Sequence, residues 1–187
     1  MHTSLAEPQL PEDQLIAAAK QGNREAFREL VLMHYQGGIN VVYRLSGEMP
    51  LAEDVAQETF IRVWTKLDTY RPVGSFRSWV YRIATNAALD ILRRRKEEVD
   101  IDEIPLSAPG SGVEHNLIRQ QQAQIVRKAV LDLPPASRSV LVLREYEGLS
   151  YQEIADSLDI PIGTVMSRLA YARGILKQEL ARQMEGS

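Results

Sequence analysis

Apolar side chains recur every three or four residues along most of this chain, and no stretch alternates with the period of two that marks a strand. The clearest case is Pro50 to Leu67, where a proline opens a stretch whose apolar stripe includes Phe60, Val63 and Trp64. The same spacing predicts helices over residues 13–21, 23–46, 76–96, 117–131, 135–147, 150–158 and from 161 onward. The pattern therefore predicts an all-α protein.

Residues that favour helix ends stand where these stretches begin and stop. Short polar side chains can accept hydrogen bonds from the free amides of a first turn, and glycine readily ends a helix. The expected N-caps are Asp13, Asn23, Ser75 and Ser150, the last in a capping box with Glu153, and the expected stops are Gly22 and Gly148.

A stretch without helical periodicity divides the chain. Residues 97–116 contain six acidic residues, no Lys or Arg, and a cluster of Pro, Gly and Ser, which is the composition of a flexible linker. The expected organisation is a mobile tail (1–12), a first small helical domain (13–96), an acidic linker (97–116) and a second small helical domain (117–187).

The composition narrows the classes of protein to which the chain could belong. The 187 residues have a net charge of −3, no cysteine, no signal peptide and no apolar run long enough to insert into a membrane, so a soluble cytoplasmic protein without cysteine chemistry is expected. No pattern calls for a cofactor. Although the chain is acidic overall, residues 71–96 contain seven basic residues and one acid, which suggests that different segments have different partners.

Asp54, Gln57 and Glu58 fall three and four residues apart, on the side of their helix opposite its apolar stripe. This acidic edge could meet a basic partner, or it could be an ordinary solvated face.

A second polar edge lies on the predicted helix 76–96. Arg82, Asn86 and Arg93 point away from its apolar stripe and are flanked by Tyr81 and Thr85. Guanidinium groups bind phosphate and stack on bases, and an Asn amide can pair with a base edge, so the edge suits nucleic acid. The basic residues at the end of this helix could equally complement the helix dipole.

Residues 150–176 have the pattern of a helix-turn-helix, with small Ala155 at the helix crossing and Val165 facing back toward it. An ordinary helical hairpin is the alternative. The second helix would enter the major groove and present Thr164, Met166, Ser167, Arg168, Ala170, Tyr171 and Arg173 to bases or backbone.

Three segments together, AEDVAQETFIRVW, FRSWVYRIATNAALDILRRRK and SYQEIADSLDIPIGTVMSRLAYAR, resemble the extracytoplasmic-function sigma factors of bacterial RNA polymerase. The resemblance implies a dissociable promoter-specificity subunit. It implies that Asp54, Gln57 and Glu58 dock on a coiled coil of the largest core subunit, and that an anti-sigma factor is a further partner.

The same resemblance implies two binding sites for promoter DNA. Single-stranded minus-ten DNA would meet Arg77, Tyr81, Arg82, Asn86 and Arg93, with the loop 68–75 accepting an unstacked base, and the helix-turn-helix would read the minus-thirty-five duplex. The linker would lie in the RNA exit path of the polymerase.

Two other functions compete with this one. A stand-alone helix-turn-helix regulator would account only for residues 135–180. An all-α hydrolase could use Glu53, Asp54 and Glu58, yet none of the three histidines stands at ligand spacing to these acids.

Overall fold

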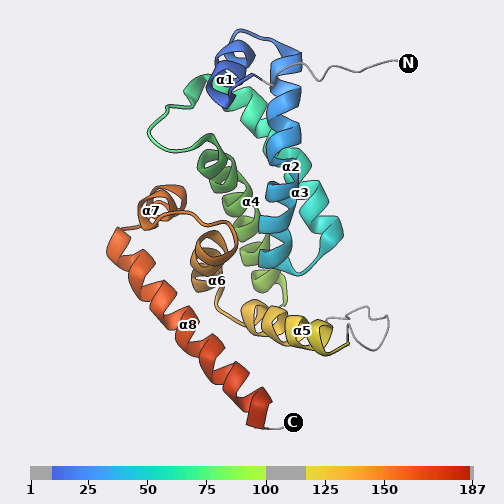
Figure 1. Ribbon diagram of the computed structural model, residues 1–187, viewed down its shortest axis with the longest axis vertical. Helices are drawn as coiled ribbons and strands as arrows, with labels where there is room; N and C mark the ends of the chain where they lie inside the picture. Colours follow the sequence, from blue (N-terminus) through green and yellow to red (C-terminus); the bar gives the residue numbers. More distant parts are fainter. Residues whose placement is uncertain (1–9, 100–116, 186–187) are drawn as a thin grey trace, which may run out of the picture.

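The computed structural model describes residues 10–99 and 117–185, with side chains over residues 10–95 and 122–182. Throughout these ranges the backbone forms helices and turns without a strand, which confirms the all-α prediction (Figure 1). None of the helices in these ranges is long and apolar enough to span a bilayer.

The first group of helices packs around α2, which runs through its centre. Buried side chains of α2, α3 and α4 meet there, among them Val41, Leu45, Val63 and Val80. The elements of this group are α1 (Glu12–Lys20), α2 (Arg24–Ser46), α3 (Met49–Lys66), the short 3-10 turn η1 (Leu67–Thr69) and α4 (Phe76–Val99).

The second group is built on the long last helix. Val165, Leu169 and Ala172 of that helix are buried against the shorter helices beside it. The elements are α5 (Leu117–Leu131), α6 (Pro135–Leu141), the π-helical turn η2 (Val142–Tyr146), α7 (Tyr151–Leu158) and α8 (Ile162–Glu185).

Most of the predicted helix ends are where the sequence places them. The Asn23 side chain accepts hydrogen bonds from two amides of α2, and the Ser78 amide donates to Ser75 Oγ at 3.1 Å. Ser150 and Glu153 form the predicted capping box. Asp13 is not a cap, because α1 begins one residue earlier, after Pro11, and Asp13 lies in the first turn.

One core prediction is wrong. The Trp64 side chain is 37% exposed, because the stripe of α3 is wider than the surface that α2 and α4 cover. Its ring packs at the rim against Phe27, with 4.7 Å between the ring centroids.

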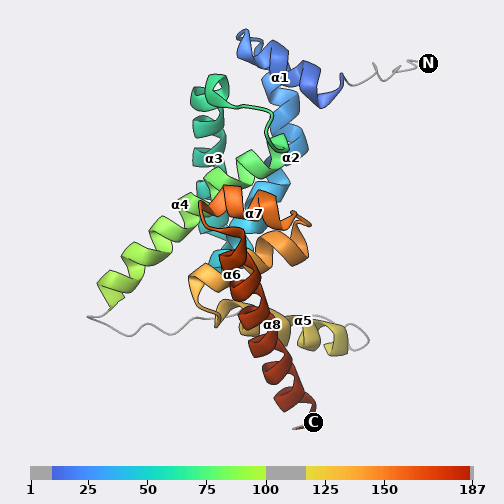
Figure 2. The same cartoon turned by 90° about the vertical axis from the view of Figure 1, so that its left-hand side faces the viewer.

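The two groups of helices pack directly against each other. In Figure 2, α7 lies across α4. The second group also contacts α2 through α5, α6 and η2. The carbonyl of Leu45, at the carboxyl end of α2, accepts a hydrogen bond from the buried Arg138 of α6, and the Gly47 carbonyl accepts one from Arg127 of α5 at 2.6 Å. A positive charge at a helix carboxyl end is favourable because it opposes the helix dipole.

The predicted linker begins later than expected, since α4 continues through Val99. The rest of it, residues 100–116, and most of the predicted tail, residues 1–9, lie outside the described residues. The domain boundaries remain predictions.

Candidate nucleic-acid and partner interfaces

The acidic edge predicted on α3 is exposed. Glu58 Oε1 accepts a hydrogen bond from Arg62 Nε at 2.9 Å, one turn along the helix. Among the described residues, the side chains of Asp54 and Gln57 have no hydrogen-bond or ion-pair partner. The Asp54 carboxylate and the Gln57 amide are therefore available to bind another molecule.

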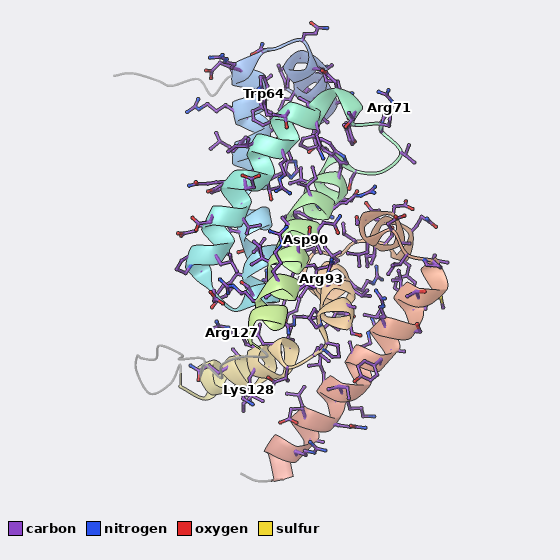
Figure 3. All side chains as sticks on the ribbon, turned by 180° about the vertical axis from the view of Figure 1, so that it is seen from behind. Trp64, Arg71, Asp90, Arg93, Arg127 and Lys128 are labelled. Carbon is purple, nitrogen blue, oxygen red and sulfur yellow. The ribbon has the colours of Figure 1, made fainter. Side chains whose placement is uncertain are left out.

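An apolar groove adjoins this edge. The groove has a volume of about 610 Å³ and lies between α2 and α3, where Gln57, Ile61 and Trp64 face Phe27 and Tyr35. Figure 3 shows Trp64 on the α3 side of the molecule, away from α8. The acidic edge and the groove therefore form one continuous surface.

The polar edge predicted on α4 is only partly accessible. Arg77, Arg82, Asn86 and Arg93 are exposed, and Arg93 makes an ion pair of 3.3 Å with Asp90. The flanking residues differ from expectation, because Tyr81 is 4% exposed and Thr85 is fully buried. Helical spacing correctly places Tyr81 and Thr85 beside the edge. It could not predict that other helices cover both side chains.

Tyr81 is held in place by both groups of helices. Its ring lies against Gly37 of α2, where a Cβ would overlap the hydroxyl oxygen. The carboxyl group of Glu147, which follows η2, acts on this hydroxyl electrostatically. Burial, reinforced by the Glu147 charge, raises the pKa of Tyr81 to about 12. The phenol is therefore neutral and able to donate its proton in a hydrogen bond.

The second helix of the helix-turn-helix presents the predicted residues outward. Met166 is 54% exposed and Tyr171 is 51% exposed, and Ser167 and Ala170 lie on the same open face. Thr164 and Arg168 are half-buried at its margins. A face of this kind, without a protein partner in the described residues, can lie against a DNA groove.

Arg173 is engaged within its own group. Its Nη2 lies 2.5 Å from Glu145 Oε1 and its Nε lies 3.0 Å from the same oxygen. This contact raises the pKa of Arg173 and fixes the direction of its guanidinium group.

The turn of the helix-turn-helix has an uncommon backbone. Asp159 adopts a left-handed conformation with φ of 53°, which a short polar side chain tolerates better than most. Ser150 caps α7 through the Glu153 amide at 3.2 Å. Although desolvation opposes it, hydrogen bonds from Ser150 and Ser75 lower the pKa of the Glu153 carboxyl group.

The structure brings two sets of predicted DNA-binding residues together. Asn86 and Arg93 of α4 line a cleft of about 370 Å³ with Arg168 of α8. Figure 3 shows Asp90 and Arg93 on α4, on the side of that helix nearest α6. No group of three or more His, Asp or Glu residues that could hold a metal occurs in the described parts of the chain.

Sequence reasoning missed Arg138, Arg127, Arg44 and Glu147, which join the two groups of helices. Arg138 stands between Ser137 and Ser139, so nothing in its immediate sequence marked it as a buried residue. Charged residues are rarely buried unless they have partners.

Two family models match the two groups of helices. Sigma-70 region 2 matches residues 30–98, which span most of α2 through α4, and Sigma-70, region 4 matches residues 123–176, which include the helix-turn-helix. These matches define a protein of the sigma-70 class. Sigma factors of this class are DNA-recognition subunits rather than enzymes.

Relatives that match nearly the whole chain place it more narrowly within the sigma-70 class. The ECF RNA polymerase sigma factor SigW of Bacillus subtilis is 32% identical over 176 residues, covering 88% of this chain and 94% of that protein. The ECF RNA polymerase sigma-E factor of Escherichia coli is 36% identical over 178 residues, covering 88% and 92%. SigE of Mycolicibacterium smegmatis is 38% identical over 173 residues, covering 89% of this chain and 66% of that protein.

Solved structures agree over both groups of helices. CnrH, in complex with the cytosolic domain of CnrY, is 27% identical with a TM-score of 0.70, covering 91% of this chain and 97% of that one. The sigma factor RpoE of Bartonella quintana, in complex with the anti-sigma factor NepR, is 25% identical with a TM-score of 0.66, covering 83% and 96%.

The chain belongs to the extracytoplasmic-function (ECF) sigma factors of RNA polymerase, and its function is promoter recognition. The family resemblance drawn from the sequence is thereby confirmed. A stand-alone regulator would leave the match over residues 30–98 unexplained.

Proposed function

We propose that the chain works in the cytoplasm as a dissociable subunit that docks on the RNA polymerase core through Asp54, Gln57 and Glu58. The observation that carries this proposal is the exposed edge of α3, where Asp54 and Gln57 lack any partner within the described residues. Carboxylate and amide oxygens suit the basic side chains of a coiled coil, and charge-assisted hydrogen bonds are the stronger kind. The apolar groove beside Gln57 offers additional surface to bury.

Promoter DNA would be held at two places. Arg77, Arg82, Asn86 and Arg93 of α4, with Tyr81 once it is uncovered, would bind the melted minus-ten strand. Guanidinium groups pair with phosphates, and an exposed amide can read the edge of an unstacked base. The chain would contribute binding energy and strand separation and no bond chemistry.

The outer face of α8 would read the minus-thirty-five duplex. Met166, Ser167 and Ala170 form its open centre, and Arg168 and Arg173 lie at the margins. Because the central residues are small or apolar, contacts with thymine methyl groups suit them better than bidentate pairing with guanine.

Run-off transcription with purified core polymerase and a promoter of this sigma factor tests the docking edge. Asp54→Asn removes one charge from the α3 edge and keeps its shape. A lost charge-assisted hydrogen bond lowers affinity for core by about tenfold or more. Glu53→Gln is the matched control, because Glu53 is the exposed neighbour on the same helix and is not part of the proposed edge.

The expected result is a loss of transcription at limiting protein for Asp54→Asn, restored by excess protein, with Glu53→Gln unchanged. Equal activity of the two variants would refute the assigned edge. A complete failure of the unaltered chain to support initiation with any core enzyme would refute the larger proposal.

We further propose an anti-sigma factor as a regulatory partner. Both similar structures described above are complexes, one of CnrH with CnrY and one of RpoE with the anti-sigma factor NepR, and they match this chain over both groups of helices. Affinity purification from cells is expected to recover a second small protein besides polymerase. Recovery of polymerase alone under every growth condition would contradict this.

A further inference from the structure

The loop between η1 and α4 is fixed at its start by a residue of α1. The carbonyl of Tyr70, its first residue, accepts a hydrogen bond from Lys20 Nζ at 2.8 Å. The same ammonium group lies 5.5 Å from the centre of the Tyr70 ring, and the face of an aromatic ring attracts cations. Because Lys20 is half-buried, water screens its charge less than at an exposed site. We name residues 70–75 the Tyr70 loop.

The Tyr70 side chain in turn determines the shape of the loop. Its hydroxyl donates to the Gly74 carbonyl at 3.0 Å, so one side chain joins the two ends of the loop. The ring is 6% exposed and packs against Phe76 and Trp79, with 5.3 Å and 5.2 Å between the ring centroids. Burial raises the pKa of Tyr70, so the phenol keeps the proton that it donates.

The helix that carries Lys20 has a position set by α2. Near the start of α1, Glu12 Oε1 lies 2.6 Å from Nε2 of His34 on α2. The inward face of α1 is buried against the first group at Leu15, Ile16 and Ala19. Lys20 is the last residue of this helix. Its bond to Tyr70 therefore connects the loop to an element that is itself held in place.

The other residues of the Tyr70 loop are exposed. Arg71, Pro72, Val73 and Gly74 all face solvent, and Val73 is 88% exposed. An exposed connection between two helices is ordinarily mobile and loses conformational entropy when a ligand orders it. Contacts that already hold the bound shape reduce this loss. The contacts of Lys20 and Tyr70 therefore pre-organise the loop.

The Tyr70 loop forms part of a cleft suited to a nucleobase. The loop and the first turns of α4 line one side of a cleft of about 660 Å³, with α7 on the other side, and the first group contributes Arg71, Trp79 and Arg82 among others. Figure 3 shows Arg71 on this loop, which extends away from the ends of α3 and α4. Aromatic rings and guanidinium groups are side chains on which an unstacked base can stack.

We propose that Lys20 is a positioning residue for promoter opening, which acts through Tyr70 to hold the Tyr70 loop in the shape that receives an unstacked base of the minus-ten strand. This inference rests on the function proposed for α4 and on the base-accepting loop that the sequence resemblance implies. It gives α1 a part in strand separation. Loss of the Lys20 bond should weaken the contact with that one base and leave the other strand contacts in place.

Removal of single bases from the DNA tests this role. Holoenzyme assembled from purified core and saturating chain is bound to fluorescent single-stranded DNA with the minus-ten sequence of a promoter of this sigma factor, and one base is removed at each position in turn. For the unaltered chain, loss of the accepted base should lower affinity about tenfold. Lys20→Met should lower affinity for the complete strand by a similar factor and abolish most of the penalty at that one position.

Three further variants sharpen the comparison. Lys20→Arg keeps a charged donor and should restore most of the affinity and of the penalty. Tyr70→Phe keeps the ring and removes the bond to Gly74, so it should also reduce the penalty at that position, and it keeps the test valid if Lys20→Met folds poorly. Lys66→Met is the matched control and should behave like the unaltered chain. It removes an exposed charge at the end of α3 whose side chain has no hydrogen-bond or ion-pair partner within the described residues.

A uniform loss of affinity in Lys20→Met, with the penalty at the accepted base retained, would overturn the inference, because it would show that Lys20 only stabilises the fold. An undiminished penalty in both Lys20→Met and Tyr70→Phe would overturn it as well. If the unaltered holoenzyme shows no penalty at any position, the base-accepting function of the loop is itself refuted. Failure of the positioning role and failure of the proposed function therefore give different results.

Discussion

Replacing Arg138 tests the most buried charge-assisted contact between the two groups of helices. Its guanidinium group donates to the Leu45 carbonyl of α2 and, within its own group, to the carbonyls of Leu131 and Leu133, the last at 2.9 Å. Burial lowers the pKa of Arg138, and the nearby Asp132 carboxylate acts in the opposite direction. The desolvation cost is therefore offset by three hydrogen bonds.

Arg138→Met keeps an unbranched, flexible stem of similar apolar character and removes all three hydrogen bonds. Two of the stranded acceptors, the carbonyls of Leu45 and Leu133, lie in buried hydrogen bonds. Each buried acceptor left without a hydrogen bond costs about 1–3 kcal/mol of stability. Part of this loss is offset, because the variant no longer has to desolvate a charged guanidinium group. The expected loss of unfolding free energy is about 2–4 kcal/mol.

Urea unfolding followed by circular dichroism measures this loss as a lower midpoint with an unchanged slope. Arg127→Met is the matched control, because Arg127 also donates to the end of α2, at Gly47, but from a half-buried position that water can enter. We expect that variant to lose about 1 kcal/mol. Equal losses in the two variants, or a loss below about 1 kcal/mol for Arg138→Met, would refute the reasoning.

Two further predictions concern smaller groups. Ser150→Ala removes the N-cap of α7 and should cost about 1 kcal/mol in urea unfolding, and retention of full stability by this variant would contradict the capping role. Glu147 has a pKa raised chiefly by burial, with Tyr81, Arg44 and Arg77 acting in the opposite direction, so folding binds its proton more tightly. Its contribution to stability is therefore greatest below its ordinary pKa of 4.5 and declines as pH rises through the raised value. The difference in unfolding free energy between the native chain and Glu147→Gln, followed from about pH 4 to about pH 7, should fall as pH rises, and a flat difference would contradict this sign.

Local signals in the sequence were sufficient for the helices themselves. Asn23, Ser75 and Ser150 act within a few residues of their own position, so their capping roles could be predicted without tertiary structure. The inward face of α8 follows equally from spacing, because Val165 and Leu169 lie one turn apart.

Contacts between the two groups of helices could not be predicted in this way. Helical spacing placed Tyr81 beside an exposed edge, whereas the fold buries it against Gly37 of α2, and Glu147 of the second group also acts on it. The reverse error occurred at Trp64, which belongs to the apolar stripe but lies beyond the surface that its neighbours cover. In both cases burial depends on packing against helices that are distant in the sequence, and helical periodicity does not predict which helices those are.

The two proposed surfaces of the first group differ in how the packing of the two groups affects them. α3 lies apart from α7 and α8 (Figures 1 and 3), and it packs chiefly on α2, α4 and η1. Docking on core through Asp54 therefore does not involve the contact between the two groups, whereas Glu147 of the second group acts on Tyr81. The packing of the two groups should therefore limit access to Tyr81 while leaving the α3 edge accessible.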